Sequence, residues 1–263
     1  MLNELRLYFR LIKIHLLSGM EYKGWPFTIS SVVFYCISEP FVIIMMFSRF
    51  GNIGGWTLER ILLIYSIALT SFGFAKILCN GFDYFPWYMV RSGDFDRLLL
   101  RPKSLVVQVA GSYCNIQRMG NPIGGLVIMI WMLSRLGVTF SLQDVVMLAL
   151  ALIGGFMVYA GVYVMSSGIS FFTIGDMHWI YVFSNASFET TRIPVDHMPS
   201  VLRNMFTFLM PMLVISYFPA SAIGGWGGSY WRGWLALPAG VAFLAVSMLV
   251  WRIGVKHYKS TGS

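Results

Sequence analysis

One short segment, residues 91–103, carries the densest charge in this chain. Its sequence, RSGDFDRLLLRPK, holds six charged side chains, although only 11% of the 263 residues are charged and 57% are hydrophobic. Long apolar stretches flank the segment on both sides. Because charged side chains are costly inside a bilayer, this segment is predicted to face water, where a soluble partner can bind it.

The charged segment also contains the signals of a short helix. Ser92 or Asp94 can cap its first turn, and Pro102 cannot continue it. Residues three and four apart share a face of a helix. The apolar face holds Phe95, Leu98 and Leu99, and the charged face holds Asp94, Arg97 and Arg101. Such a helix fits a groove on another protein or rests on the lipid surface, and the residues alone favour neither alternative.

Composition places the rest of the chain in a membrane. Its mean hydropathy is +0.70, and its apolar share exceeds the ~45–50% of soluble domains. No acidic or basic residue occurs between Val145 and Gly175. A single span needs only ~20 apolar residues. This run therefore predicts most of two spans, with a turn near Ser166–Gly168.

Hydropathy and charge interruptions together predict six membrane-spanning helices. The second of them contains Lys76, close enough to its end for the ammonium group to reach the membrane surface. An even number of spans puts both termini on the same side, and the predicted fold is an all-α integral membrane protein. The predicted spans are Trp25–Phe47, Ile61–Gly81, Asn115–Leu133, Val145–Met165, Ile169–Phe188 and Gly233–Trp251.

The distribution of basic residues sets the orientation. With a cytoplasmic N-terminus, thirteen of the 19 lysines and arginines fall on the cytoplasmic side, as the positive-inside rule requires. The charged segment then faces the cytoplasm. This topology and anionic lipid account for the net charge of +8, so nucleic acid is not expected as a partner.

Residues 1–24 are predicted to form an amphipathic helix in the inner membrane interface. The stretch is not a cleavable signal sequence, because basic residues interrupt its apolar ones and no small-residue cleavage site follows. At 100° per residue, the polar face holds Asn3, Arg6, Arg10 and Lys13, and the apolar face holds Leu5, Phe9, Ile12 and Leu16. The helix either anchors the topology or helps to guide a partner.

Three ionisable residues and a run of prolines are candidates for a transport pathway. Glu39, Asp176 and His178 fall inside predicted spans, where ionisable groups often line a pathway but also serve as packing contacts. Prolines and glycines then interrupt residues 190–231. Short re-entrant helices with Pro211 and Pro219 at an outer gate are predicted there. The alternative is a surface helix followed by a flexible loop.

The sequence lacks the motifs of several classes of enzyme and metal-binding protein. It contains no G-x-x-x-x-G-K-[ST] for nucleotide binding, no G-x-S-x-G for hydrolysis and no H-x-x-x-H for metal. Its three cysteines show no metal-ligand spacing. The chain is therefore not expected to be an enzyme by itself, or to hold a metal or cofactor.

Two motifs resemble those of ABC transporter permeases of the export type, in which a six-span membrane subunit is separate from the ATPase. The first is Gly93–Pro102 followed by Gln108. The second is the proline-punctuated stretch with Ile193-Pro194, Met198-Pro199, Pro211 and Tyr217–Ala220. Lys103 departs from the pattern, where an apolar residue is expected, and is expected to modify partner docking. With the length and span count, the resemblance covers most of the chain.

The resemblance implies a single permease domain over residues 1–263, with a cytoplasmic coupling loop at 82–104. It implies a partner ATPase that binds ATP and Mg, and a second permease, identical or related, in the bacterial plasma membrane. The coupling residues it implies are Asp94, Phe95, Asp96, Arg97, Leu98, Leu99, Leu100, Arg101 and Pro102. Two rival functions are a proton-coupled secondary transporter and a non-transporting membrane assembly subunit.

Overall fold

The computed structural model describes residues 2–21, 25–52, 54–90, 92–137, 141–173, 185, 188–227 and 229–258, and all regular elements in these ranges are helical. The predicted all-α class is confirmed over this part of the chain. The α-helices are α1 Leu2–Glu21, α2 Trp25–Phe50, α3 Leu58–Leu78, α4 Asn80–Phe85, α5 Phe95–Leu99, α6 Leu105–Ala110, α7 Gly120–Arg135, α8 Leu142–Ser170, α10 Ser200–Asn204, α11 Met212–Ile215, α12 Tyr217–Gly224 and α13 Ala236–His257. The shorter turns of 3-10 or π-helix are η1 Pro86–Val90, η2 Ile116–Met119, η3 Thr190–Arg192, η4 Val195–His197, η5 Met205–Leu209 and η6 Tyr230–Leu235.

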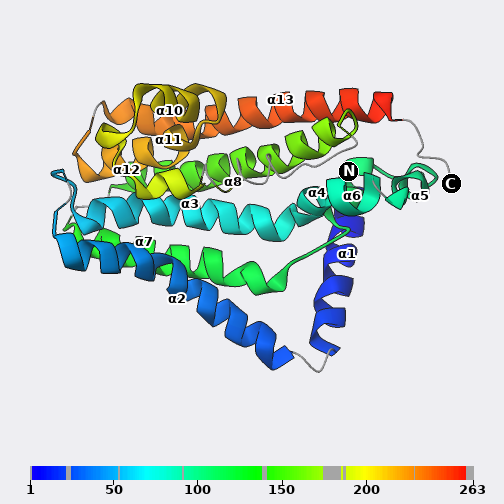
Figure 1. Ribbon diagram of the computed structural model, residues 1–263, viewed down its shortest axis with the longest axis horizontal. Coiled ribbons are helices and arrows are strands. Elements are labelled where there is room, and N and C mark those ends of the chain that lie inside the picture. Colours follow the sequence, from blue (N-terminus) through cyan, green and yellow to red (C-terminus); the bar gives the residue numbers. More distant parts are fainter. Residues whose placement is uncertain are drawn as a thin grey trace.

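Helices α3, α7, α8 and α13 run roughly along the long axis of the molecule, with α3 between α7 and α8 (Figure 1). Nearly every side chain of α3 from Ile61 to Lys76 is buried, because α7 packs on one side and α8 on the other. We call the two ends of this bundle the α5 end and the α12 end. Helices α4, α5 and α6 gather at the first, and α1 stands across the bundle there (Figure 1).

Among the described residues, four helices are long and apolar enough to cross a membrane: α2, α3, α8 and the helix that includes η6 and α13. A bent pair, Ser200–Leu209 with Met212–Gly224, passes the same test only when its two halves are taken together, and they meet at 71°. Helix α7 has 16 residues, which is short for the ~30 Å hydrocarbon layer. The fifth span predicted from sequence, Ile169–Phe188, falls mostly outside the described residues.

The predicted turn at Ser166–Gly168 is wrong, because α8 continues without a break to Ser170. The serines satisfy their hydroxyls without ending the helix: Ser166 donates to the Tyr163 carbonyl and Ser167 to the Phe82 carbonyl of α4. Gly168 instead allows a close approach, because a Cβ atom there would lie 2.8 Å from the Trp251 nitrogen. Polar and small residues in this run are therefore packing contacts between helices, as is common in membrane proteins.

Glycines let α8 and α13 pack with their backbones in contact, and this is the most extensive helix pair in the bundle. A Cβ atom added at Gly240 would lie 2.7 Å from the Cα atom of Gly154, and Gly154 itself faces the backbone of Ala236. Since both neighbours are backbone atoms, neither can rotate away. The α8–α13 contact therefore requires glycine at both positions.

Gly240→Val is expected to destabilise the protein by about 3 kcal/mol, at the upper end of the range for overpacked interiors. Thermal unfolding followed by tryptophan fluorescence in detergent measures this loss. The control is Ala245→Val on the same helix, where the side chain is exposed and the expected change is within about 0.5 kcal/mol. Equal midpoints for the two variants would contradict the close contact.

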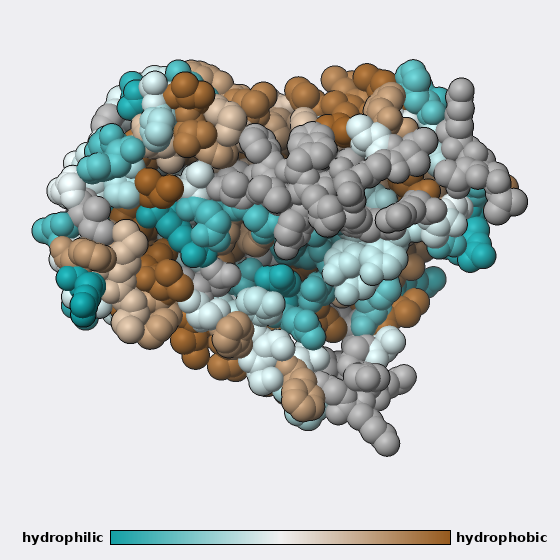
Figure 2. Space-filling view, viewed as in Figure 1, coloured by the Kyte–Doolittle hydropathy of each residue, from teal (hydrophilic) through white to brown (hydrophobic). Residues whose placement is uncertain are grey.

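In Figure 2, the edge of the molecule along α13 and the face turned toward the viewer differ in polarity. Apolar side chains dominate the α13 edge, and hydrophilic ones gather at both ends of the molecule. Hydrophilic side chains also lie across the middle of this face, over α3 and α7. Lipid tails suit the α13 edge, whereas the polar band over α3 and α7 requires water or another polar surface.

Candidate coupling site

The charged segment lies at one end of the bundle, where α4, η1, α5 and α6 connect α3 with α7 (Figure 1). Helix α1 packs beside it on α6 and the end of α3. The Tyr8 hydroxyl donates a 2.6 Å hydrogen bond to the Leu78 carbonyl, and the Glu4 carboxylate accepts one from the Ser104 nitrogen. The last residues of α8 and α13 reach the same end. Elements from the whole length of the chain thus meet around α5.

Helix α5 covers Phe95–Leu99, within the short helix that the sequence predicts, and ends before Pro102. Asp94 precedes the first turn as predicted, but its side chain makes no capping hydrogen bond to the backbone. Its carboxylate instead accepts a 2.8 Å hydrogen bond from the Ser92 hydroxyl and lies 3.3 Å from the Arg97 guanidinium. This ion pair is exposed, and such pairs contribute little to stability.

The residues of the predicted apolar face do not all point in the same direction. Phe95 and Leu98 are buried against the bundle, whereas Leu99 and Leu100 are exposed, with 86% of Leu100 accessible. A partner can therefore touch Leu99 and Leu100 but meets little of Leu98. The outward surface also includes the exposed residues Asp94, Arg97, Arg101, Pro102 and Lys103, and Asp96 is half-buried beside it.

Phe95 is the anchor of α5, because its ring enters a cluster of aromatic side chains from four parts of the chain. Its centroid lies 5.2 Å from that of Phe85, 5.2 Å from that of Phe171 and 4.9 Å from that of Tyr258. The aromatic cluster consists of Phe82, Phe85, Phe95, Phe171, Trp251 and Tyr258. Interlocked rings resist displacement, so Phe95 holds α5 against α4 and against the ends of α8 and α13.

Gln108 holds the backbone that follows α5. Its buried side-chain amide donates to the Lys103 carbonyl at 3.0 Å and to the Leu98 carbonyl at 3.5 Å. The Lys103 carbonyl lies beyond the C-terminal end of α5, and the Leu98 carbonyl, in its last turn, also accepts from the Arg101 nitrogen. Gln108 therefore fixes the exposed turn that presents Arg101 and Pro102.

Gln108→Ala is expected to loosen the 98–103 turn by about 1–2 kcal/mol, because the Lys103 carbonyl loses its side-chain donor and the Leu98 carbonyl loses one of its donors. Hydrogen–deuterium exchange of a peptide covering residues 95–105 measures the change, and trypsin cleavage after Arg101 and Lys103 should accelerate with it. Ser104→Ala serves as the control, since Ser104 is exposed. Identical exchange in the two variants would contradict the role of Gln108.

Lys76 is buried and paired, so the predicted reach of its ammonium group to the membrane surface is wrong. Its Nζ atom lies 2.6 Å from the Asp83 carboxylate, and the two side chains are 8% and 17% exposed. The ammonium group also lies 4.9 Å from the ring centroid of Tyr163 and 5.7 Å from that of Phe72. The pair joins α3 to α4 across the residue that separates them, Cys79.

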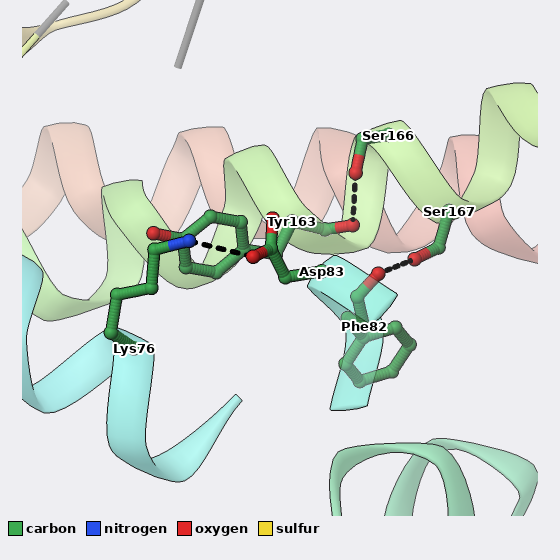
Figure 3. Close-up of polar contacts among 6 residues, drawn as sticks. All are labelled: Lys76, Phe82, Asp83, Tyr163, Ser166 and Ser167. Carbon is green, nitrogen blue, oxygen red and sulfur yellow. Dashed lines mark hydrogen bonds and ion pairs between the residues drawn. The ribbon is translucent and has the colours of Figure 1, made fainter. Parts of the chain in front are cut away.

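Figure 3 shows that α4 lies against α8 beside this ion pair. The Ser167 hydroxyl of α8 donates a 2.5 Å hydrogen bond to the Phe82 carbonyl. On another side, Gly81 meets the backbone of Val109 in α6, with no room for a side chain. Helix α4 is therefore fixed to α3, α8 and α6 at once, and it leads through η1 to α5.

The described bundle also contains hollows. The smaller, of about 370 Å³, is at the α5 end and is lined by Gly81, Tyr84, Tyr88, Met89, Ser112 and Tyr113. Burial and the neighbouring Tyr113 raise the pKa of Tyr84 to about 12, so this phenol is uncharged at neutral pH. The larger hollow, of about 540 Å³, is almost entirely apolar and lies between α8, α13 and η5.

Pro211 separates the two halves of the bent pair and borders the larger hollow. Both outer ends of the pair lie at the α12 end of the bundle. Just before the pair in the sequence, the Asp196 carboxylate accepts a 3.0 Å hydrogen bond from the Trp56 indole. Just after the pair, the ring of Trp226 lies beneath the Arg60 guanidinium of α3. Pro219 is buried within α12. The pair thus enters and returns beside the same end of α3.

The other predicted pathway residues are not assembled by the described structure. Glu39 precedes Pro40 in α2, which bends partway along its length (Figure 1), but its side chain lies outside the described part. Asp176 and His178 also lie outside it. In the part of the chain that the structure describes, no three His, Cys, Asp or Glu side chains come together in a way that could hold a metal ion.

The Lys76–Asp83 pair and the aromatic cluster were missed by the sequence predictions. A weak signal for the pair was available, since a lysine and an aspartate flank the Asn80-Gly81 step at the end of an apolar helix. The aromatic cluster offered no such signal. Its members come from positions 82 to 258 and only meet in the folded chain.

Comparison with known proteins identifies the family. The sequence profile described as ABC-2 family transporter protein matches residues 33–262, which is most of the chain. No curated protein and no solved structure matches. The match includes the charged segment, the proline-rich stretch, most of α2, and helices α3, α7, α8 and α13. This chain therefore belongs to the ABC-2 transporter family, and it is a multi-pass membrane permease of an ABC transporter.

Proposed function

We propose that this permease exports its substrate with energy from a separate ATPase subunit, which binds ATP and Mg²⁺ and docks on α5. Members of this family normally work with such a subunit. ATP binding would move α5, and the bundle would change between inward-open and outward-open states. The residues proposed for docking are Leu99, Leu100, Arg97, Arg101 and Lys103, which form the outward surface of α5 and its following turn.

The arrangement of α5 carries this proposal. One side of the helix exposes leucines and arginines, and the other side anchors Phe95 among aromatic rings of α4, α8 and α13. A loop that only rests on lipid has no need for such an anchor. A helix that receives force needs both a free surface for the partner and a rigid connection to the spans.

We further propose six crossings, with the bent pair as a re-entrant element at the outer side. Phe171, after α8, lies in the aromatic cluster at the α5 end, and Asp196 lies at the α12 end. This supports a crossing between them, as the sequence predicts. The return of the bent pair to Arg60 supports the re-entrant assignment. Its second half begins with α11, which packs on α8 and α13, and irregular structure inside a membrane requires such protein contacts.

The basic residues support an orientation with the α5 end and both termini in the cytoplasm, and with α1 on the anionic inner leaflet of a bacterial plasma membrane. A second permease, a copy or a relative, would complete the pathway. The polar band over α3 and α7 (Figure 2) supports a face turned away from lipid. Pro211, Pro219, Glu39, Asp176 and His178 remain the proposed gate or pathway residues.

Purification of the tagged chain from its native membrane in mild detergent tests this proposal. We expect an ATPase subunit to copurify, and ATP hydrolysis by the complex to stop when the catalytic residue of that subunit is replaced. Isolation of the chain without any ATPase would contradict the proposal. Movement of the permease that follows a proton gradient and ignores ATP would instead identify a secondary transporter.

A further inference from the structure

We propose that the Lys76–Asp83 ion pair is the strut that makes α3 and α4 move as one body, so that force on α5 reaches the α12 end through α3. This inference rests on the proposed coupling to an ATPase and assigns positioning roles to two residues that do not touch the ATPase. The first observation is the break itself. Helix α3 ends at Leu78 and α4 begins at Asn80, with non-helical dihedral angles at Cys79.

A helix break next to the point where force enters would normally act as a hinge. The regular ladder of backbone hydrogen bonds stops there, and only local bonds such as Phe82 N to Cys79 O continue across it. A push on α4 would then fold the chain at Cys79 and leave α3 behind. Lys76 and Asp83 lie on opposite sides of this residue and close the hinge with a 2.6 Å contact.

Stability alone gives little reason for a buried ion pair at this position. Two buried ions lose their hydration, and well-packed apolar residues can usually replace such a pair without loss of stability. What a pair adds is geometry: the ammonium and carboxylate groups must meet in one relative position of the two helices. Phe72 and Tyr163 lie around the ammonium group and keep it in that position.

The remaining contacts of α4 would let it transmit movement to other helices. The Ser167 hydroxyl bonds to the Phe82 carbonyl, and Trp251 packs on the rings of Phe82 and Phe85. These contacts connect α4 with α8 and α13, which pack against each other along most of their length. Only the ion pair fastens α4 to α3 by charge, in the described residues. The ion pair therefore makes α3, the central helix, move together with α8 and α13 when α4 moves.

The critical variant replaces both charges, Lys76→Met with Asp83→Leu, because replacing one leaves the other buried without its partner and can prevent folding. Spin labels at Val201 in α10 and at Leu142 at the start of α8 report on the α12 end, where both side chains are exposed. The full permease–ATPase complex is measured with and without ATP and vanadate, by electron–electron double resonance.

In the unmodified complex, we expect ATP with vanadate to change the population of the two distances by about five-fold or more, the lower end of typical coupling between sites. The double variant should still bind the ATPase and hydrolyse ATP, but its distance change should be smaller, because α3 no longer follows α4 while α8 and α13 still do. The exchanged pair, Lys76→Asp with Asp83→Lys, should restore part of the response and also covers the case in which the neutral variant does not fold. Ser71→Ala, which removes a polar contact between α3 and α8, should respond normally.

The outcomes separate the two proposals. A full response in the neutral double variant overturns the strut, while the coupling to the ATPase stands. No response in the unmodified complex overturns the coupling itself. A reduced response in the neutral variant, with ATPase binding and hydrolysis retained and the response recovered in the exchanged pair, supports the strut.

Discussion

Leu100→Asp combined with Arg101→Glu is expected to separate the permease from its ATPase without unfolding the chain. Both side chains are exposed at the end of α5, and 86% of Leu100 is accessible. The change places acidic groups where the proposed partner meets an apolar and a basic one. Central contacts of this kind cost about 2–4 kcal/mol in binding when lost, which is a fall of about thirty-fold to a thousand-fold in affinity.

Copurification of the ATPase from detergent extracts, followed by titration of the purified subunits, measures this loss. Arg203→Glu is the matched control, because it reverses an exposed charge in α10, far from α5 in Figure 1. It should bind the ATPase normally. Leu98→Asp cannot replace the test variant, since Leu98 is buried and a charge there would disturb folding. Undiminished binding of the Leu100→Asp, Arg101→Glu variant would show that docking occurs elsewhere.

Phe95→Ala is expected to leave the docking surface intact and to break the transmission behind it. The ring is fully buried and contacts Phe85, Phe171 and Tyr258. Removal of such a ring costs about 3–5 kcal/mol, and here the loss falls on the connection of α5 with the bundle. The ATPase should bind and hydrolyse ATP, while the α12 end no longer responds to the nucleotide.

The nucleotide-dependent distance between Val201 and Leu142 measures transmission in this variant, and copurification measures docking. Phe95→Leu should recover part of the response because it refills much of the space. Phe50→Ala, at an exposed position of α2, is the control for loss of an aromatic ring. A normal distance response in Phe95→Ala would contradict the aromatic cluster as the route of coupling.

Local patterns in the sequence predicted the parts of the fold that depend on neighbouring residues. The short helix before Pro102 and the long apolar helices α2, α3 and α13 follow from caps, prolines and hydropathy. The different burial of Phe95, Leu98 and Leu99 could not be predicted in this way. Helical spacing assigns all three to one face without saying which neighbour each one meets. Only the position of α5 on the bundle separates the buried from the exposed leucines.

The errors came from residues whose role depends on distant partners. Ser166–Gly168 has the composition of a turn, yet its side chains serve contacts with α4 and α13. Lys76 has the position of a residue that reaches the membrane surface, yet Asp83 folds back to pair with it. In both cases a tertiary contact overrides the local preference, and the coupling machinery consists of such contacts.

The most direct test of this account is the side of the membrane on which α5 lies. A cysteine at Leu100, in a chain whose three native cysteines are replaced, can be labelled with a membrane-impermeant maleimide. We predict rapid labelling in inverted vesicles, protection there by the bound ATPase, and no labelling in intact cells. Labelling of Leu100→Cys in intact cells would place α5 outside the cytoplasm and contradict the proposed coupling.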